Sequence, residues 1–142
     1  MKIDFVFDSK QLDKNLKRLQ KSMPQVIDKA LLATAQFGTQ TILDRTERGI
    51  GYTGAFDSYS AKYALFRKAA GRKTSPVDLN FSGKMLGAMA ATKERKGVAK
   101  IYFTRASEAA KAVGNNRKRP FFGFNRQEQN KLRRFFFNRI KV

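Results

Sequence analysis

The sequence predicts an α+β fold, in which a long N-terminal helix (broken near Pro24) and a C-terminal helix pack on a small antiparallel β-sheet. Three observations lead to this prediction. Residues 2–8 and 98–104 alternate apolar and polar side chains, as half-buried strands do, and residues 24–48 and 125–142 repeat apolar residues at helical spacing. The 142 residues, of which 42% are hydrophobic, are also enough to bury a core, so we expect one domain over residues 1–142.

The N-terminal elements follow from their apolar spacing. Ile3, Phe5 and Phe7 alternate with mostly polar neighbours and predict a strand with one buried face. Asp8 or Ser9 can then cap a helix. Its apolar face is formed by leucines at helical spacing: Leu12, Leu16 and Leu19.

A second, longer helix is expected after Pro24, with Ser22 as its cap and proline in its first turn. It continues to about Arg48 and ends at Gly49, a residue type that favours helix C-termini. Its alanine-rich sequence is moderately apolar on all sides, so we expect it to pack against other elements on more than one side.

The middle of the chain, about residues 49–83, is predicted to be an extended loop that contains a short helix over about 58–70. Residues 71–83 are expected to be exposed, because Gly71, Pro76 and Gly83 interrupt regular structure there. Two apolar-leaning runs, Met85–Thr92 and Val98–Thr104, then predict an antiparallel hairpin. In its second strand we expect two inward residues, Ile101 and Phe103, and two outward residues, Lys100 and Tyr102.

The last third of the chain predicts a short helix or turn that ends at Gly114 and an extended basic loop over about 114–124. A C-terminal helix follows. Arginines flank its apolar stripe, which consists of Leu132, Phe135, Phe136 and Ile140.

Charge is the strongest functional signal. The chain has 30 Lys and Arg against 11 Asp and Glu, a net charge of +19, and residues 51–142 hold 21 of the basic but only 5 of the acidic side chains. Such a field favours a polyanionic partner: nucleic acid, an acidic protein surface or anionic lipid. No apolar run approaches the roughly 18–20 residues of a membrane span, and the basic C-terminal helix has no second lipid anchor, so we expect no membrane partner.

Composition argues against most catalytic chemistry. The chain has no cysteine and no histidine, which removes the thiolate nucleophile, the commonest metal ligand and the usual general base. Asp44 and Glu47 share a helix face and are the closest carboxylate pair for a metal-dependent nuclease, but no third carboxylate lies nearby. We therefore expect no enzymatic activity, no metal and no cofactor.

Residues 49–54, Gly-Ile-Gly-Tyr-Thr-Gly, match the G-x-G-x-x-G spacing of dinucleotide-binding loops. That loop binds phosphate only when it leaves a strand and opens a helix. Here it follows a long helix, and residues 55–60 begin no apolar-periodic helix. The glycines are therefore expected to form a flexible connection rather than a nucleotide site.

Residues 117–122, Arg-Lys-Arg-Pro-Phe-Phe, mix basic and aromatic side chains and leave two interpretations open. They resemble single-strand nucleic-acid platforms, on which bases stack. Alternatively, Phe121, Phe122 and Phe124 anchor the loop in a core or a subunit interface, while Arg117, Lys118 and Arg119 lie outside. We favour the anchor, because phenylalanine is more often buried than used for stacking.

The order of these motifs resembles the neck and tail-completion (head–tail joining) proteins of long-tailed bacteriophages, including the virion-morphogenesis proteins of Mu-like phages. In that family a glycine- and tyrosine-marked loop precedes a Leu-x-x-Ser-Gly-x-Leu-like step into a hairpin. This chain matches the step with Leu79, Ser82, Gly83, Met85 and Leu86. A late Arg-Pro-Phe-Phe-Gly motif, residues 119–123, then leads into a helix; the glycine-rich turn that often precedes it in relatives is replaced here by residues 112–119.

The resemblance implies a non-enzymatic connector that forms a homo-oligomeric ring, six-fold or alternatively twelve-fold, at the head–tail junction of the virion, after assembly in the host cytoplasm. Its partners would be neighbouring head-completion or connector proteins, tail-tube or terminator proteins, and DNA in the channel. For subunit or partner contacts we expect Tyr52, Phe56, Tyr59, Phe121, Phe122 and Phe124. For contacts with a polyanion or an acidic partner we expect Arg72, Lys73, Arg117, Lys118 and Arg119. The alternative function is that of a stand-alone basic nucleic-acid-binding protein.

Overall fold

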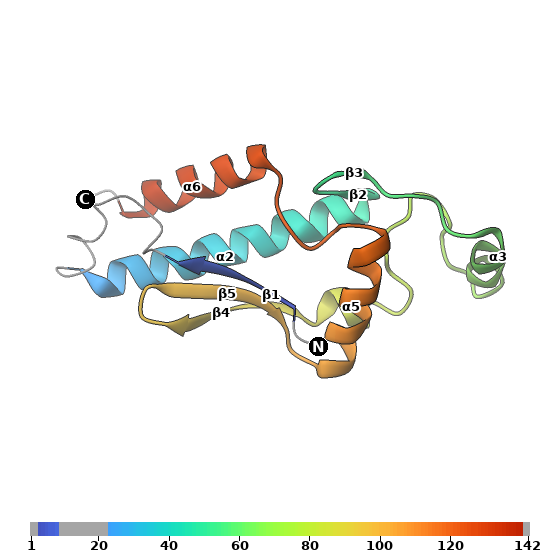
Figure 1. The fold of residues 1–142 in the computed structure, drawn as a ribbon, viewed down its shortest axis with the longest axis horizontal. Coiled ribbons are helices and arrows are strands. Elements are labelled where there is room, and N and C mark those ends of the chain that lie inside the picture. The colour runs from blue at the N-terminus through green and yellow to red at the C-terminus, as the bar shows by residue number, and fades with distance from the viewer. Residues whose placement is uncertain (1–2, 9–22, 141–142) are drawn as a thin grey trace.

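The computed structural model describes residues 3–8 and 23–140 and has the expected α+β architecture. The elements in chain order are β1 (Asp4–Asp8), α2 (Pro24–Glu47), β2 (Ile50–Gly51), β3 (Gly54–Ala55), α3 (Ala61–Ala69), α4 (Lys84–Gly87), β4 (Met89–Arg95), β5 (Val98–Phe103), α5 (Ala106–Lys118) and α6 (Arg126–Ile140). Helix α2 runs through the middle of the molecule, between the sheet and α6 (Figure 1). The first helix, predicted with Leu12, Leu16 and Leu19 on its apolar face, and Ser22, the predicted cap of the second helix, lie outside the described residues.

The main sheet has three antiparallel strands in the order β1-β5-β4. Phe5 pairs with Ile101 in β5, and β4 and β5 form the predicted hairpin. Gly97 closes its turn with a φ of +76°, a conformation that side chains disfavour and glycine adopts readily. Ile101 and Phe103 point into the core as predicted, and both are almost fully buried.

Helix α2 begins with Pro24 in its first turn, a position that needs no backbone N–H, and Met23 is its N-cap residue. Gly49 follows its C-terminus with a φ of +78°, which confirms the predicted stop. The helix packs against the sheet on one side and α6 on the other. Gly38 permits this close packing, because a Cβ there would lie 2.8 Å from the ring of Phe124.

The hairpin prediction was wrong at both ends of its first strand. Residues 84–87 form the short helix α4, which begins after Gly83 at a φ of +79°. Strand β4 then continues through charged residues that were expected in the turn. Ion pairs compensate for this, because Lys93 reaches Asp28 of α2 at 2.9 Å and Glu94 reaches Lys100 at 2.7 Å.

The predicted loop over 114–124 was too long, because α5 does not end at Gly114 but continues to Lys118. The side chain of Asn116 explains where the chain turns, since its Oδ1 accepts hydrogen bonds from the N–H groups of Phe121 and Phe122, both at 3.0 Å. Residues 49–83 are also more regular than expected. Within the segment predicted to be exposed, Val77, Asp78 and Leu79 are buried.

The glycines of the G-x-G-x-x-G stretch end α2 and form the small β2–β3 hairpin, so no strand-to-helix phosphate cradle exists there. Gly51 has a packing role. A Cβ on this residue would collide with the carbonyl oxygen of Pro120 and lie 2.6 Å from the ring of Phe56. The glycine loop is thereby pressed against the residues that precede α6.

Gly51→Ala is expected to lower the free energy of unfolding by at least about 1–3 kcal/mol, because the backbone of Pro120 must move to admit the methyl group. Urea denaturation followed by circular dichroism measures the change. Gly114→Ala is the matched control. A Cβ there meets nothing within 4 Å in the interior of α5, so alanine should stabilise by about 0.5–1 kcal/mol. Equal effects of the two variants would contradict the packing role of Gly51.

Candidate partner interface

Residues 56–83, called the arm below, extend from the end of the molecule at which α2 terminates. Figure 1 shows α3 at the outer end of this segment, well apart from α6 and the sheet. The Ser60 side chain caps α3 by accepting a hydrogen bond from the N–H of Tyr63 at 3.2 Å. This confirms the short helix predicted within residues 58–70. Helix α3 therefore has defined structure although it makes few contacts with the other helices and strands, while Val77 and Leu79 of the arm are buried in the main core.

Arg67 holds the arm together. The residue is 1% exposed. Its guanidinium donates from Nε to the carbonyl of Lys73 at 2.7 Å and from an Nη to the carbonyl of Asn80 at 2.9 Å, and it pairs with Asp78 at 3.4 Å. It also lies 4.6 Å from the ring centroid of Tyr59. A buried arginine thus replaces the apolar core that such a short segment lacks. No spacing pattern in the sequence distinguishes this arginine from its exposed neighbours, and sequence analysis missed it.

Tyr59 and Arg119 fasten the arm to α5. The Tyr59 hydroxyl oxygen accepts a hydrogen bond from the N–H of Leu79 at 3.1 Å, and burial raises the pKa of this phenol. Arg119, at the C-terminal end of α5, donates to the carbonyls of Asp57 and Ser58 at 2.8 and 2.9 Å and lies over the Tyr59 ring. Both residues were predicted to make contacts with partners, but here they join two parts of one chain.

The outer part of the arm exposes a series of aromatic rings. Tyr63, Phe66 and Phe81 stack in succession, with centroid distances of 6.0 and 5.7 Å. Phe66 is 58% exposed, and the adjacent Leu65 is 69% exposed, the largest value among the described apolar side chains. Contiguous exposed apolar groups of this kind mark binding surfaces in soluble proteins.

Between the arm and the helices α4 and α5 lies a cleft of about 870 Å³, called the basic cleft below. Its aromatic lining comes from the arm: Tyr59, Tyr63, Phe66 and Phe81. Its charged lining comes from α3, α5 and the residue that follows α5: Arg67, Glu108, Lys111, Arg117, Lys118 and Arg119. Five basic side chains therefore face one carboxylate, which gives the cleft a positive potential.

Glu108 is 4% exposed at the edge of this cleft. Its Oε1 pairs with Lys111 at 3.1 Å, while its Oε2 has no hydrogen-bond partner among the described residues. A buried oxygen without a donor is costly, so a ligand that supplies an N–H group would be favoured here. Sequence analysis missed Glu108, because one glutamate in an alanine-rich helix carries no recognisable signal.

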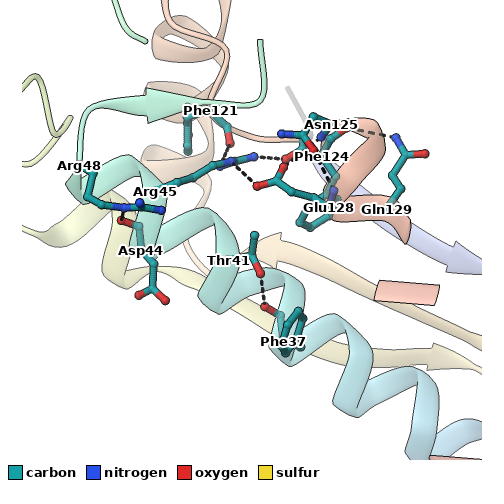
Figure 2. A network of polar contacts seen from close by, with 11 residues as sticks. Phe37, Thr41, Asp44, Arg45, Arg48, Phe121, Phe124, Asn125, Glu128 and Gln129 are labelled. Atoms are coloured by element: carbon teal, nitrogen blue, oxygen red, sulfur yellow. Dashed lines mark hydrogen bonds and ion pairs between the residues drawn. The ribbon is translucent and has the colours of Figure 1, made fainter. Parts of the chain in front are cut away.

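Phe121, Phe122 and Phe124, which were predicted to contact partners, are instead buried within the core of the chain itself. These phenylalanines belong to residues 119–125, called the late loop below. Figure 2 shows how it is fixed: Arg45 of α2 donates to the carbonyls of Phe121 and Gly123 and pairs with Glu128 at 3.0 Å. Burial lowers the pKa of the Arg45 guanidinium, and the charge of Glu128 opposes that shift. The loop is an anchor within the domain, which was the interpretation favoured from sequence.

Glu128 and Asn125 also form a reciprocal cap at the start of α6. The N–H of Asn125 donates to Glu128 Oε1 at 3.0 Å, and the N–H of Glu128 donates to Asn125 Oδ1 at 2.8 Å (Figure 2). The same carboxylate therefore binds Arg45 and caps the helix. This double role explains why the polypeptide turns sharply into α6 at this point.

The other predicted interface residues are divided between the body and the arm. Tyr52 and Phe56 are half-buried; the N–H of Tyr52 donates to the carbonyl of Pro120 at 3.1 Å, and its ring packs on Gly123. Tyr52 thus holds the glycine hairpin against the late loop, while Phe56, the first residue of the arm, packs beside Gly51. Tyr59 lies in the arm and lines the basic cleft.

The predicted basic contacts lie in two groups. Arg117, Lys118 and Arg119 line the basic cleft, where Arg117 and Lys118 are exposed and Arg119 is half-buried. Arg72 and Lys73 are exposed on the arm outside that lining, with Arg72 lying 5.5 Å from the ring centroid of Phe81. The structure thus unites three of the five predicted cations with the arm aromatics.

The carboxylates of the described residues form no group that can hold a metal ion. Asp44 accepts a hydrogen bond from the side chain of Gln40 at 2.7 Å, and both Asp44 and Glu47 are exposed on α2. None of the described helices is both long enough and apolar enough to cross a membrane. No protein-family model, curated protein or solved structure matches the chain.

Proposed function

We propose that this chain is a structural protein of a bacteriophage virion, which forms a ring at the head–tail junction and completes or connects the tail. The ring is six-fold, or alternatively twelve-fold. Its neighbours are head-completion or connector proteins on one side and tail-tube or terminator proteins on the other. The chain needs no catalytic activity for this role.

The arm is the observation that carries the proposal. It extends from the body, has its own buried arginine network and exposes Leu65 and Phe66, so it offers a structured apolar surface to another molecule. A ring is built from head-to-tail contacts, in which one surface of each subunit meets a different surface of the next. A projecting arm at one end of an elongated subunit supports such a contact.

The net charge of +19 supports a place at the head–tail junction. A channel that carries DNA requires a surface compatible with closely spaced phosphates, and acidic neighbours are attracted by the same field. Both contacts rest on screened charges, so assembly with neighbours should weaken as salt rises.

A second function, stand-alone nucleic-acid binding, is favoured by one observation. The exposed rings of Phe66 and Phe81 stack on each other, and Arg72 lies 5.5 Å from the ring centroid of Phe81. Aromatic rings beside arginine form the kind of platform on which single-stranded bases stack. The two functions differ in assembly and in their response to salt.

Native mass spectrometry and negative-stain microscopy of the purified full chain distinguish them, together with the anisotropy of labelled DNA over a salt series. We expect closed rings, which Leu65→Asp disrupts because it places a charge on the most exposed apolar residue of the arm. Gln127→Asp adds the same charge on an exposed turn of α6 and should leave the rings intact. A chain that stays monomeric at all concentrations and binds DNA tightly with a steep salt slope would overturn the proposal.

A further inference from the structure

The basic cleft has an apolar wall that residues 3–8 and 23–140 leave partly exposed. Phe66 is 58% exposed and Phe81 36%, although both rings face the cleft and stack on each other at 5.7 Å. Aromatic residues that a partner buries are among those that contribute most to the binding free energy of protein interfaces. The cleft is about 870 Å³ and open, so an extended segment can lie across it.

The charge of the cleft restricts the occupant. Five basic side chains and one acidic side chain line it, in a chain with a net charge of +19. A basic occupant would be repelled, and this includes the basic surfaces of a second copy. An occupant that carries several negative charges is attracted.

The hydrogen bonds already formed in the cleft favour a peptide over a nucleic acid. Arg67 and Arg119 each donate from Nε and an Nη to backbone carbonyls of this chain, so their planar forks are not available to grip phosphates. The buried Oε2 of Glu108 lacks a donor. A peptide supplies backbone N–H groups that can pair with this oxygen, whereas a phosphate backbone supplies none.

We infer that the basic cleft binds an acidic segment of a different protein. The segment places an apolar side chain against Phe66 and Phe81 and its carboxylates beside Lys118 and Arg117. This inference deepens the proposed function, on which it rests, by naming the chemistry of the neighbouring partner. It separates two faces of the arm: Leu65, outside the cleft lining, serves contact between copies, and Phe66 serves the partner.

Fluorescence anisotropy with the full chain at about 0.15 M salt tests the inference. The probe is a fluorescein-labelled peptide of about twelve residues, in which leucine and phenylalanine alternate with aspartate and glutamate. Two comparison probes are the same peptide with serine in place of its apolar residues, and labelled oligothymidylate of equal length. We expect the first peptide to bind at least about tenfold more tightly than either comparison probe.

Two pairs of variants locate the binding. Phe66→Ser and Lys118→Glu should each weaken binding of the acidic apolar peptide by about tenfold. Their matched controls, Val26→Ser on α2 and Lys62→Glu on α3, alter exposed residues outside the cleft lining and should leave it within about twofold. All four sites are exposed, and circular dichroism checks that each variant is folded.

Equal binding of the apolar and serine peptides would overturn the inference, because charge alone would then explain the binding. Equal effects of the variants and their controls would also overturn it, because the peptide would then bind outside the cleft. Tighter binding of oligothymidylate that depends on Phe66 would replace the peptide with a nucleic acid. A chain that forms rings without binding the peptide refutes this inference but not the proposed function. A chain that binds the peptide in the cleft but neither forms rings nor joins virions refutes the proposed function instead.

Discussion

Arg45→Met is expected to lower the free energy of unfolding by about 3–5 kcal/mol, because it removes one partner of a buried ion pair. The carboxylate of Glu128 would stay in the interior without its cation, and the carbonyls of Phe121 and Gly123 would lose their donors. Urea denaturation at neutral pH, followed by circular dichroism, measures the loss. Arg48→Met is the control. Arg48 lies three residues further along, at the exposed end of α2, and its substitution should change the free energy of unfolding by less than about 0.5 kcal/mol.

The double variant Arg45→Met with Glu128→Gln tests whether the ion pair itself is responsible. Removing the stranded carboxylate should make the double variant more stable than the sum of the two single losses predicts. Strict additivity, or a loss for Arg45→Met no larger than for Arg48→Met, would contradict the role assigned to this network.

Arg67→Met is expected to open the arm while leaving the body folded. The substitution leaves the carboxylate of Asp78 buried without a cation and frees the carbonyls of Lys73 and Asn80. The arm has no apolar core of its own to compensate. Amide hydrogen exchange measured by mass spectrometry should show protection over residues 56–83 falling by about a hundredfold or more, as expected for a local loss of about 3 kcal/mol or more.

The body reports whether this effect is local. Peptides from β4 and β5 should keep their protection, and Arg72→Met, which alters an exposed arginine of the same segment, should leave the arm protected. Unchanged protection of the arm in Arg67→Met would show that the guanidinium does not hold it. Equal loss over β4 and β5 would show that the arm and body unfold together.

The regular elements of the body were predictable because their patterns are local. Gly49 stops α2 through its own positive φ, and Gly97 closes the β4–β5 turn in the same way. Phe136 and Ile140 lie on the buried stripe of α6 as the spacing predicts. In these cases the residue that determines the structure lies within the element or within two residues of its end.

The predictions were wrong where contacts outside a helix or strand decide how that segment folds. Helix α5 continues past Gly114 to Lys118, and the chain then folds back so that Asn116 can accept from the backbone of Phe121, which only the three-dimensional structure reveals. Arg45 and Arg67 have no sequence pattern that marks them as buried. The partners of Arg45 lie 76 and 78 residues away, and those of Arg67 lie 6, 11 and 13 residues away in a loop without regular spacing. Local patterns contain no information about such partners.

The candidate interface was predicted in part for the same reason. The cluster of Arg117, Lys118 and Arg119 is visible as a run of charge, and these residues do line the basic cleft. The aromatic wall of the cleft could not be predicted, because it forms only when the arm folds and brings Phe66 and Phe81, fifteen residues apart in sequence, into contact. The phenylalanines of the late loop are equally prominent in sequence, but the Arg45 network buries them within the domain.

A symmetry-averaged cryo-electron microscopy map of virions that contain this chain tests the central proposal most directly. We expect a closed six-fold or twelve-fold ring of this α+β domain at the head–tail junction. The arm of each copy should lie on the body of the next, and a segment of a neighbouring protein should occupy the basic cleft. A junction that lacks this domain, or copies bound singly along DNA with their arms free, would contradict it.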